Sequence, residues 1–96
     1  MSMTREQYLL TCLAEECAEV AQCASKAIRF GLSPLSGRPE EWRKVNNRED
    51  IEAELGDLLG LVDMLGLIPC PDKRKQKPAK VDRYMRLSVD LGTAEG

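Results

Sequence analysis

The chain has 96 residues, enough for one domain with a modest core, and its 14 basic and 16 acidic side chains give a formal charge of −2. Aromatic side chains make up only 4% of the residues while Leu, Ala and Glu are abundant, which favours an all-α fold. The absence of histidine excludes Ser-His and Cys-His nucleophile pairs, a histidine general base and the His-bearing zinc motifs. Chemistry near neutral pH is left mainly to carboxylates, lysines and bound metal.

The first predicted element is a long helix over about residues 4–30. This stretch contains neither Pro nor Gly, and Thr4 with Gln7 three residues later fits a capping box. Gly31 is expected to end the helix. Residues 31–46 hold two Gly and two Pro among polar side chains, so they are expected to form a connection with a short helical turn around residues 40–44.

Two further helices are predicted along the rest of the chain. One covers about residues 48–67, capped by Asn46 or Asn47 and ended by the sequence IPCPD. The other follows Pro78 and covers about residues 79–91, because Pro is favoured in the first turn of a helix.

Together the three helices predict a single domain over residues 1–96, an antiparallel helical bundle. Three helices are few for a four-helix unit, so we expect oligomerisation to complete the bundle, as a homodimer or homotetramer. The apolar surface expected to meet another chain lies on the second helix and consists of Leu58, Leu61 and Leu65.

The four cysteines have no CxxC spacing, and Cys12 and Cys23 would lie about 16 Å apart on one helix, beyond disulfide reach. We expect free thiols, mostly in the core. With no secretory signal pattern and no apolar run of membrane length, the chain is expected to be cytoplasmic and to have no membrane partner.

Charge is unevenly distributed along the chain. Residues 1–69 hold 12 acidic and 7 basic side chains, whereas residues 70–96 hold 4 acidic and 7 basic ones. The basic C-terminal third could face an anion, and it could equally be a solvated tail.

Three glutamates fall close together in the first helix. At 100° per residue Glu15 and Glu19 share a narrow stripe with Lys26, and Glu16 lies beside it. Like charges at this spacing repel by roughly 0.2 to 0.5 kcal/mol per pair. One interpretation is an exposed polar face, because Leu9 and other apolar residues lie on the opposite side.

The second helix favours a site, because Glu54 lies in the middle of its apolar face. Leu58 and Leu61 project in nearly the same direction, and burying an unpaired carboxylate is costly. Asp57 follows three residues later. Two acidic pairs at this spacing, Glu16 with Glu19 and Glu54 with Asp57, suit a hard divalent cation held between two helices.

The ligand types indicate which metal and substrate to expect. Without histidine or a matching thiolate, carboxylate oxygens favour Mg²⁺, with Mn²⁺ possible, over Zn²⁺. Mg²⁺ keeps several waters and also binds phosphates, so a phosphorylated substrate is expected. A di-iron carboxylate bundle needs Glu-x-x-His motifs and is excluded by the absence of histidine.

The sequences EECAE and ELGD resemble the EExxE and ExxD motifs of the MazG-like, all-α nucleoside triphosphate pyrophosphohydrolases. The longer stretches LAEECAEVAQCASKAIRFG and IEAELGDLLGLVDML are similar to the two motif helices of small, often phage-encoded members. The stretch KVDRYMRLS is similar to their closing helix. The resemblance covers most of the chain except residues 32–47.

This resemblance implies Mg²⁺-dependent cleavage of a nucleoside triphosphate, ribo or deoxy, into a monophosphate and pyrophosphate, with no nucleic acid as partner. By motif position, the metal ligands would be Glu16, Glu19, Glu54 and Asp57. Glu15 would be catalytic, helping to bind a further metal or to orient the attacking water. The phosphates would be held by Lys26, Lys80 and Arg83.

Two other functions stay open on the sequence alone. The chain could be a binding module of the same fold that holds a nucleotide or a partner protein without hydrolysing it. It could also be a helical oligomerisation domain whose acids are only surface charges.

Overall fold

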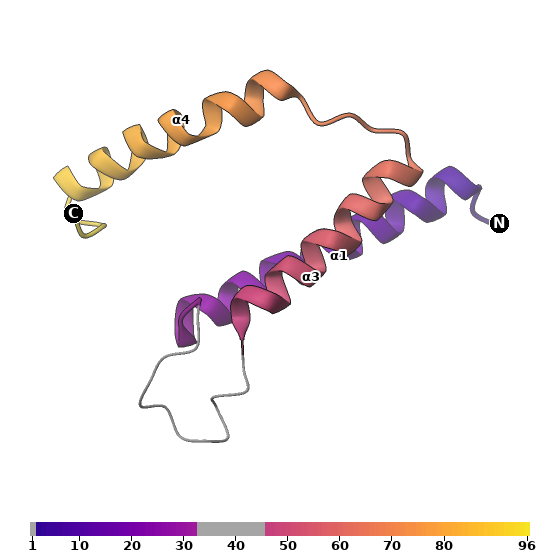
Figure 1. Cartoon of the computed structure of the whole chain (residues 1–96), viewed down its shortest axis with the longest axis horizontal. Coiled ribbons are helices and arrows are strands. Elements are labelled where there is room, and N and C mark those ends of the chain that lie inside the picture. The colour runs from indigo at the N-terminus through magenta and orange to yellow at the C-terminus, as the bar shows by residue number, and fades with distance from the viewer. Residues whose placement is uncertain (1, 33–45) are drawn as a thin grey trace.

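The structure, a computed structural model, describes residues 2–32 and 46–96. Helix α1 spans Arg5–Phe30, α3 spans Asn47–Met64 and α4 spans Pro71–Asp90 (Figure 1). The all-α prediction is therefore confirmed. The helical turn expected around residues 40–44 lies outside the described residues. In the described part of the chain, no helix is both long enough and apolar enough to cross a membrane.

Side-chain caps begin α1 and α3, and a glycine ends α1. The Gln7 backbone N–H donates to Thr4 Oγ1 at 3.1 Å, and the Thr4 N–H donates to Gln7 Oε1 at 2.9 Å, which completes the capping box. Gly31 ends α1 with φ 89°, a conformation that glycine adopts without steric cost. At the start of α3, Asn46 Oδ1 accepts a hydrogen bond from the Glu49 N–H at 3.1 Å. These predicted caps are confirmed, and Asn46 is the residue that caps α3.

Helices α1 and α3 run antiparallel and pack against each other along most of their length (Figure 1). The buried or half-buried positions of each helix recur every three or four residues, as packed helices require. On α1 these are Leu9, Cys12, Leu13, Glu16, Val20, Cys23 and Ala27. On α3 they are Asn47, Ile51, Glu54, Leu58, Leu61, Val62 and Leu65, the last just beyond the helix end.

The facing stripes revise two expectations about the core. Leu58, Leu61 and Leu65, which were expected to meet another chain, lie half-buried on the side of α3 that faces α1 of the same chain. All four cysteines are free, as predicted, but only Cys12 and Cys23 lie in the helix interface, whereas Cys17 and Cys70 are exposed. Both corrections have one cause: which face is buried depends on where the partner helix lies.

The predicted start of the last helix at residue 79 is wrong, because α4 begins at Pro71 and Pro78 lies inside it. Pro71 occupies the first turn, where its missing N–H is not needed. Pro78 deprives the Arg74 carbonyl of a helical donor, and this segment is exposed, so water can satisfy that carbonyl. The helix therefore continues through a proline that was expected to start it.

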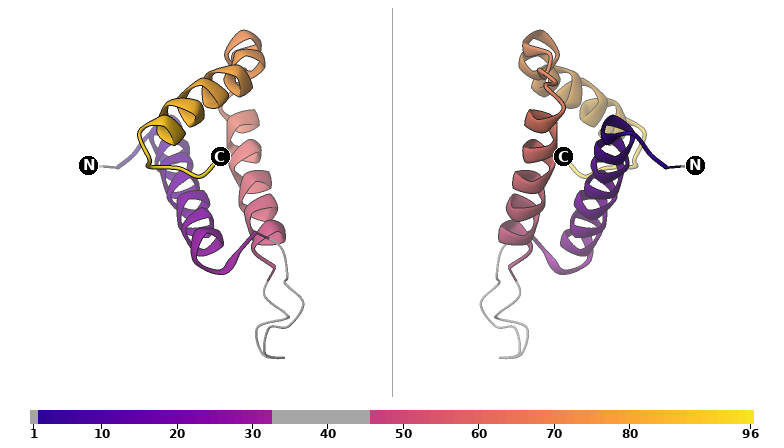
Figure 2. Two further views of the ribbon diagram at one scale, coloured as in Figure 1. Left: turned by 90° about the vertical axis from the view of Figure 1, so that its left-hand side faces the viewer. Right: turned by 90° about the vertical axis from the view of Figure 1, so that its right-hand side faces the viewer.

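Helix α4 is held differently from the other two. Among the described helices only α1 and α3 pack against each other, and α4 contacts neither. Figures 1 and 2 show α4 turning back from the end of α3 and running apart from the helix pair.

Candidate metal site

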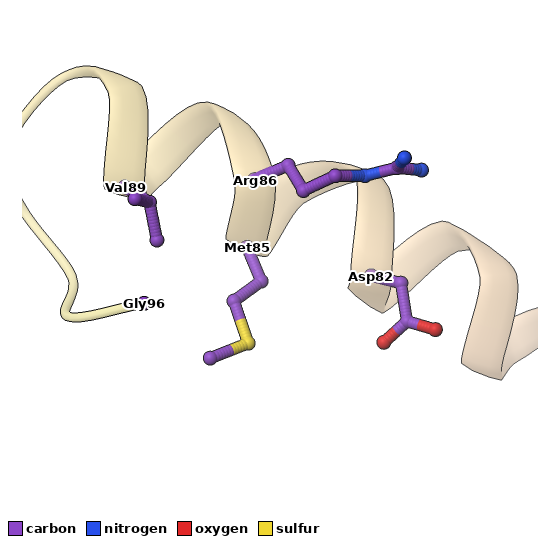
Figure 3. A pocket seen from close by; sticks show the side chains of 5 residues that line it. All are labelled: Asp82, Met85, Arg86, Val89 and Gly96. Carbon is purple, nitrogen blue, oxygen red and sulfur yellow. The ribbon is translucent and has the colours of Figure 1, made fainter.

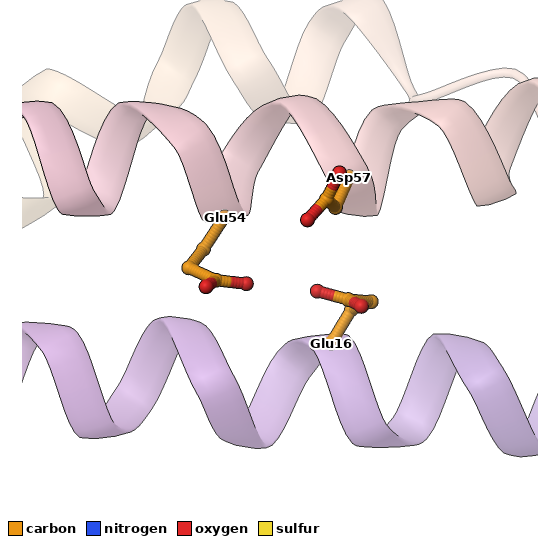
Figure 4. Close-up of side chains that lie close together, drawn as sticks. All are labelled: Glu16, Glu54 and Asp57. Atoms are coloured by element: carbon orange, nitrogen blue, oxygen red, sulfur yellow. The ribbon is translucent and has the colours of Figure 1, made fainter.

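Glu16 lies on the buried stripe of α1, between Leu13 and Val20, and its side chain points toward α3. Glu54 lies on the matching stripe of α3, and Asp57 follows one turn later. Because the two helices are antiparallel and in contact, these positions meet across the interface (Figure 4). Glu16, Glu54 and Asp57, which we call the carboxylate cluster, come from two segments far apart in the sequence.

The carboxylate cluster has the spacing of a cation site. Each of its three residues offers one carboxylate oxygen, and these oxygens all lie within 4.8 Å of one another. Glu16 and Glu54 are half-buried and Asp57 is exposed, so the cluster opens to solvent on one side. A cation bound there would have protein oxygens on one side and room for water or a phosphate on the other.

The surroundings of Glu16 disfavour its negative charge, as expected for a carboxylate whose partner would be a bound cation. Burial raises the pKa of Glu16, and a hydrogen bond to Glu54 together with the negative charges of Asp57, Glu54 and Glu19 raises it further. Two carboxylates can share a hydrogen bond only when one of them is protonated. Without a cation, the cluster therefore favours a proton on Glu16 over full ionisation.

One atom of Glu16 is left without compensation. Its Oε2 is buried and has no hydrogen-bond partner among the described residues. A buried polar atom without a partner is costly, and such atoms in native structures often mark a bound ion or water. Three carboxylates, one of which has an unsatisfied oxygen, form the donor set of a hard divalent cation, so the residues present fit such an ion.

The other predicted site residues are not brought into the carboxylate cluster. Glu19 is exposed and lies one turn along α1 from Glu16. Its negative charge contributes to the raised pKa of Glu16. Glu15 and Lys26 are exposed on α1. Lys80 and Arg83 are exposed on α4, which does not contact the helices that carry the cluster. Within one chain, no α4 side chain belongs to the site.

Asn47 positions the site, although the sequence suggested only a possible cap. Its side chain is 3% exposed, and its Nδ2 donates to the Gly31 carbonyl at 2.8 Å. This bond ties the end of α1 to the start of α3 and so helps to fix the register in which Glu16 meets Glu54. The signal in the sequence was the Asn-Asn pair, because one cap needs only one of them.

The fold and the cluster together define a helical domain that presents carboxylates from two antiparallel helices to a cation. A family model described as the MazG nucleotide pyrophosphohydrolase domain matches residues 4–68, and the chain belongs to this family. The match contains α1, α3 and the whole carboxylate cluster, and it ends before α4. The similarity of KVDRYMRLS to a closing helix therefore lies outside it. Searches of curated proteins and of solved structures gave no significant match.

Proposed function

We propose that this protein is a Mg²⁺-dependent nucleoside triphosphate pyrophosphohydrolase, which cleaves a ribo- or deoxynucleoside triphosphate into the monophosphate and pyrophosphate. The carboxylate cluster carries this proposal, because three oxygens within 4.8 Å of one another lie in the region that the family model matches. Mn²⁺, which accepts the same oxygen ligands, is the expected substitute ion.

The chain's own residues would act from fixed positions. Glu16, Glu54 and Asp57 would hold the ion, and the exposed Glu19 would add a further carboxylate from the next turn of α1. When bound, such an ion neutralises the triphosphate and lowers the pKa of a coordinated water. Glu15 would accept a proton from the attacking water or orient it, a role for which its exposed position leaves room.

Cations are needed on the outer side of the triphosphate. Lys26 is exposed on α1, in the same helix as Glu16, and we propose that it contacts the phosphate chain. Lys80 and Arg83 are proposed for the same purpose, but only if α4 approaches a carboxylate cluster.

The test is pyrophosphate release from all ribo- and deoxynucleoside triphosphates with Mg²⁺, with Mn²⁺ and with EDTA. We expect turnover of at least one nucleotide with a metal and none with EDTA. Glu54→Gln should lose about 100-fold or more in kcat/KM, because several kcal/mol of charge stabilisation depend on the metal. Glu52→Gln is the matched control, since Glu52 is exposed on the same helix outside the cluster.

Two results would contradict the proposal. If no nucleotide is hydrolysed under any condition while nucleotides still raise the melting temperature, the protein is a binding module and not an enzyme. If Glu54→Gln hydrolyses as fast as Glu52→Gln, the cluster does not carry the activity.

A further inference from the structure

The alignment of α1 with α3 is only weakly specified by their apolar side chains. The half-buried positions of both helices recur every three or four residues, so a slide of one helical turn, about 5.4 Å, would again bring apolar residues together. Without a cation, the carboxylate cluster opposes the observed alignment, because it brings three acidic oxygens within 4.8 Å of one another. Another contact is therefore needed to favour the alignment that assembles the cluster.

Helix α4 does not supply that contact. In the described part of the chain it packs against neither α1 nor α3. The groove near its end is lined by its own Met85 and Val89 together with the chain's Gly96 (Figure 3). The alignment of α1 with α3 is therefore set within the pair itself.

Two hydrogen bonds join the end of α1 to the start of α3. Asn47 Nδ2 donates to the Gly31 carbonyl at 2.8 Å, and the Arg48 N–H donates to the Leu32 carbonyl, also at 2.8 Å. The Gly31 carbonyl lies just past the helix end, where carbonyls lack a helical donor. A one-turn slide would break both bonds and leave the Asn47 amide, which is 3% exposed, without its acceptor. Apolar contacts recur after such a slide, but these two bonds do not.

We propose that Asn47 is the positioning residue that keeps Glu16 opposite Glu54 while no cation is bound. A buried asparagine in an otherwise apolar helix interface selects one register, because other registers leave its amide unpaired. The carboxylate cluster is then assembled before the cation arrives, so the cation binds without first realigning the helices. This consequence for the cation rests on the proposed function, whereas the alignment does not.

Distances between two spin labels, measured by pulsed electron paramagnetic resonance, test the alignment. The labels are attached to Ser25→Cys on α1 and Asp63→Cys on α3, in a full-length chain whose four native cysteines are replaced by alanine. Excess unlabelled protein restricts the measurement to distances within one chain. Both labelled positions are exposed and lie near opposite ends of the pair, so a one-turn slide would change the label separation by up to about 5.4 Å.

The measurement is made in EDTA at about pH 8, which favours ionised carboxylates. The labelled protein with Asn47 should give one narrow distance, and Asn47→Ala should give a broadened or second distance. Adding Glu54→Gln to Asn47→Ala should restore the single distance, because it removes repulsion that Asn47 opposes. Asn46→Ala is the matched control and should keep the single distance, since Asn46 caps α3 through the Glu49 N–H of its own helix.

Two results overturn the proposal. One is an unchanged distance in Asn47→Ala. The other is a changed distance that Glu54→Gln leaves uncorrected, because a residue that only joined the helix ends would not respond to the carboxylate cluster. If Asn47→Ala loses its helical circular dichroism, Asn47→Ser replaces it, since serine keeps a polar group at the helix start but is one bond shorter than asparagine.

Mn²⁺ binding to the unlabelled chain, measured without nucleotide from the resonance signal of free Mn²⁺, tests the consequence for the cation. Asn47→Ala should raise the dissociation constant about 10-fold, because only about one-tenth of the chains would hold the competent alignment. Asn46→Ala should leave it within about 2-fold. Equal affinities of the wild type and Asn47→Ala would show that Asn47 does not preassemble the cluster. A wild type that binds no Mn²⁺ contradicts the proposed function, and the spin-label distances still decide the role of Asn47.

Discussion

The α1–α3 pair and α4 are all strongly helical, but among the described helices only α1 and α3 are fixed by contacts with each other. The pair has facing half-buried stripes and the Asn47 bond to Gly31, whereas α4 has a cap without a side-chain hydrogen bond and an internal proline. The family match stops between the two regions. Packing therefore fixes the carboxylate cluster, whereas no contact with another described helix fixes the position of α4.

The largest difference between the regions should appear when core side chains are truncated. Leu9 is 7% exposed in the pair, so Leu9→Ala should lower the free energy of unfolding by about 2 to 3 kcal/mol. Leu87 is 52% exposed on α4, so Leu87→Ala should change it by less than about 0.5 kcal/mol. Urea denaturation followed by far-UV circular dichroism measures both. Equal losses would show that α4 is packed as firmly as the pair.

A smaller effect should come from the proton on Glu16. Its pKa is raised in the folded state, so its contribution favours folding below the unfolded-state pKa and is lost as the pH rises through the folded-state value. In EDTA, the wild type should therefore lose stability relative to Glu16→Gln between about pH 5 and about pH 8. Melting temperatures of the two proteins at both pH values measure this difference.

Mg²⁺ supplies the control for that pH dependence. A cation replaces the proton, so Mg²⁺ should stabilise the wild type more at the higher pH and should stabilise Glu16→Gln much less. If Glu16→Gln and the wild type keep the same difference at both pH values, folding does not raise the pKa of Glu16.

Local rules predicted the ends of α1 and the start of α3 from the sequence. The Thr4 and Gln7 capping box, the helix-ending Gly31 and an asparagine cap each depend on a few neighbouring residues, and all three are present. The second helix was expected to extend to about residue 67 and ends at Met64, because Leu65 and Gly66 form a turn.

Facts that depend on the partner helix were harder to predict. Periodicity placed Glu16 only beside the stripe of Glu15 and Glu19, yet α3 covers the side of α1 that carries Glu16. Glu54 could be identified because it interrupts an apolar face, which is visible within one helix. Two acids of one motif can thus have identical local signals and opposite exposure, and only the packing distinguishes them.

The smallest effect on global stability, and the sharpest test of α4, comes from its two prolines. Pro78→Ala returns a donor to the Arg74 carbonyl, so the local stability of α4 should rise by about 1 to 3 kcal/mol. Global unfolding should change by less than about 0.5 kcal/mol, because α4 does not pack on the pair. Hydrogen exchange of the residue 75–84 amides measures the local change.

Pro71→Ala is the control and should alter little, since the backbone N–H of a first-turn residue has no helical acceptor and its loss costs nothing. If residues 72–77 exchange as unfolded chain in the wild type, α4 begins at Pro78 after all.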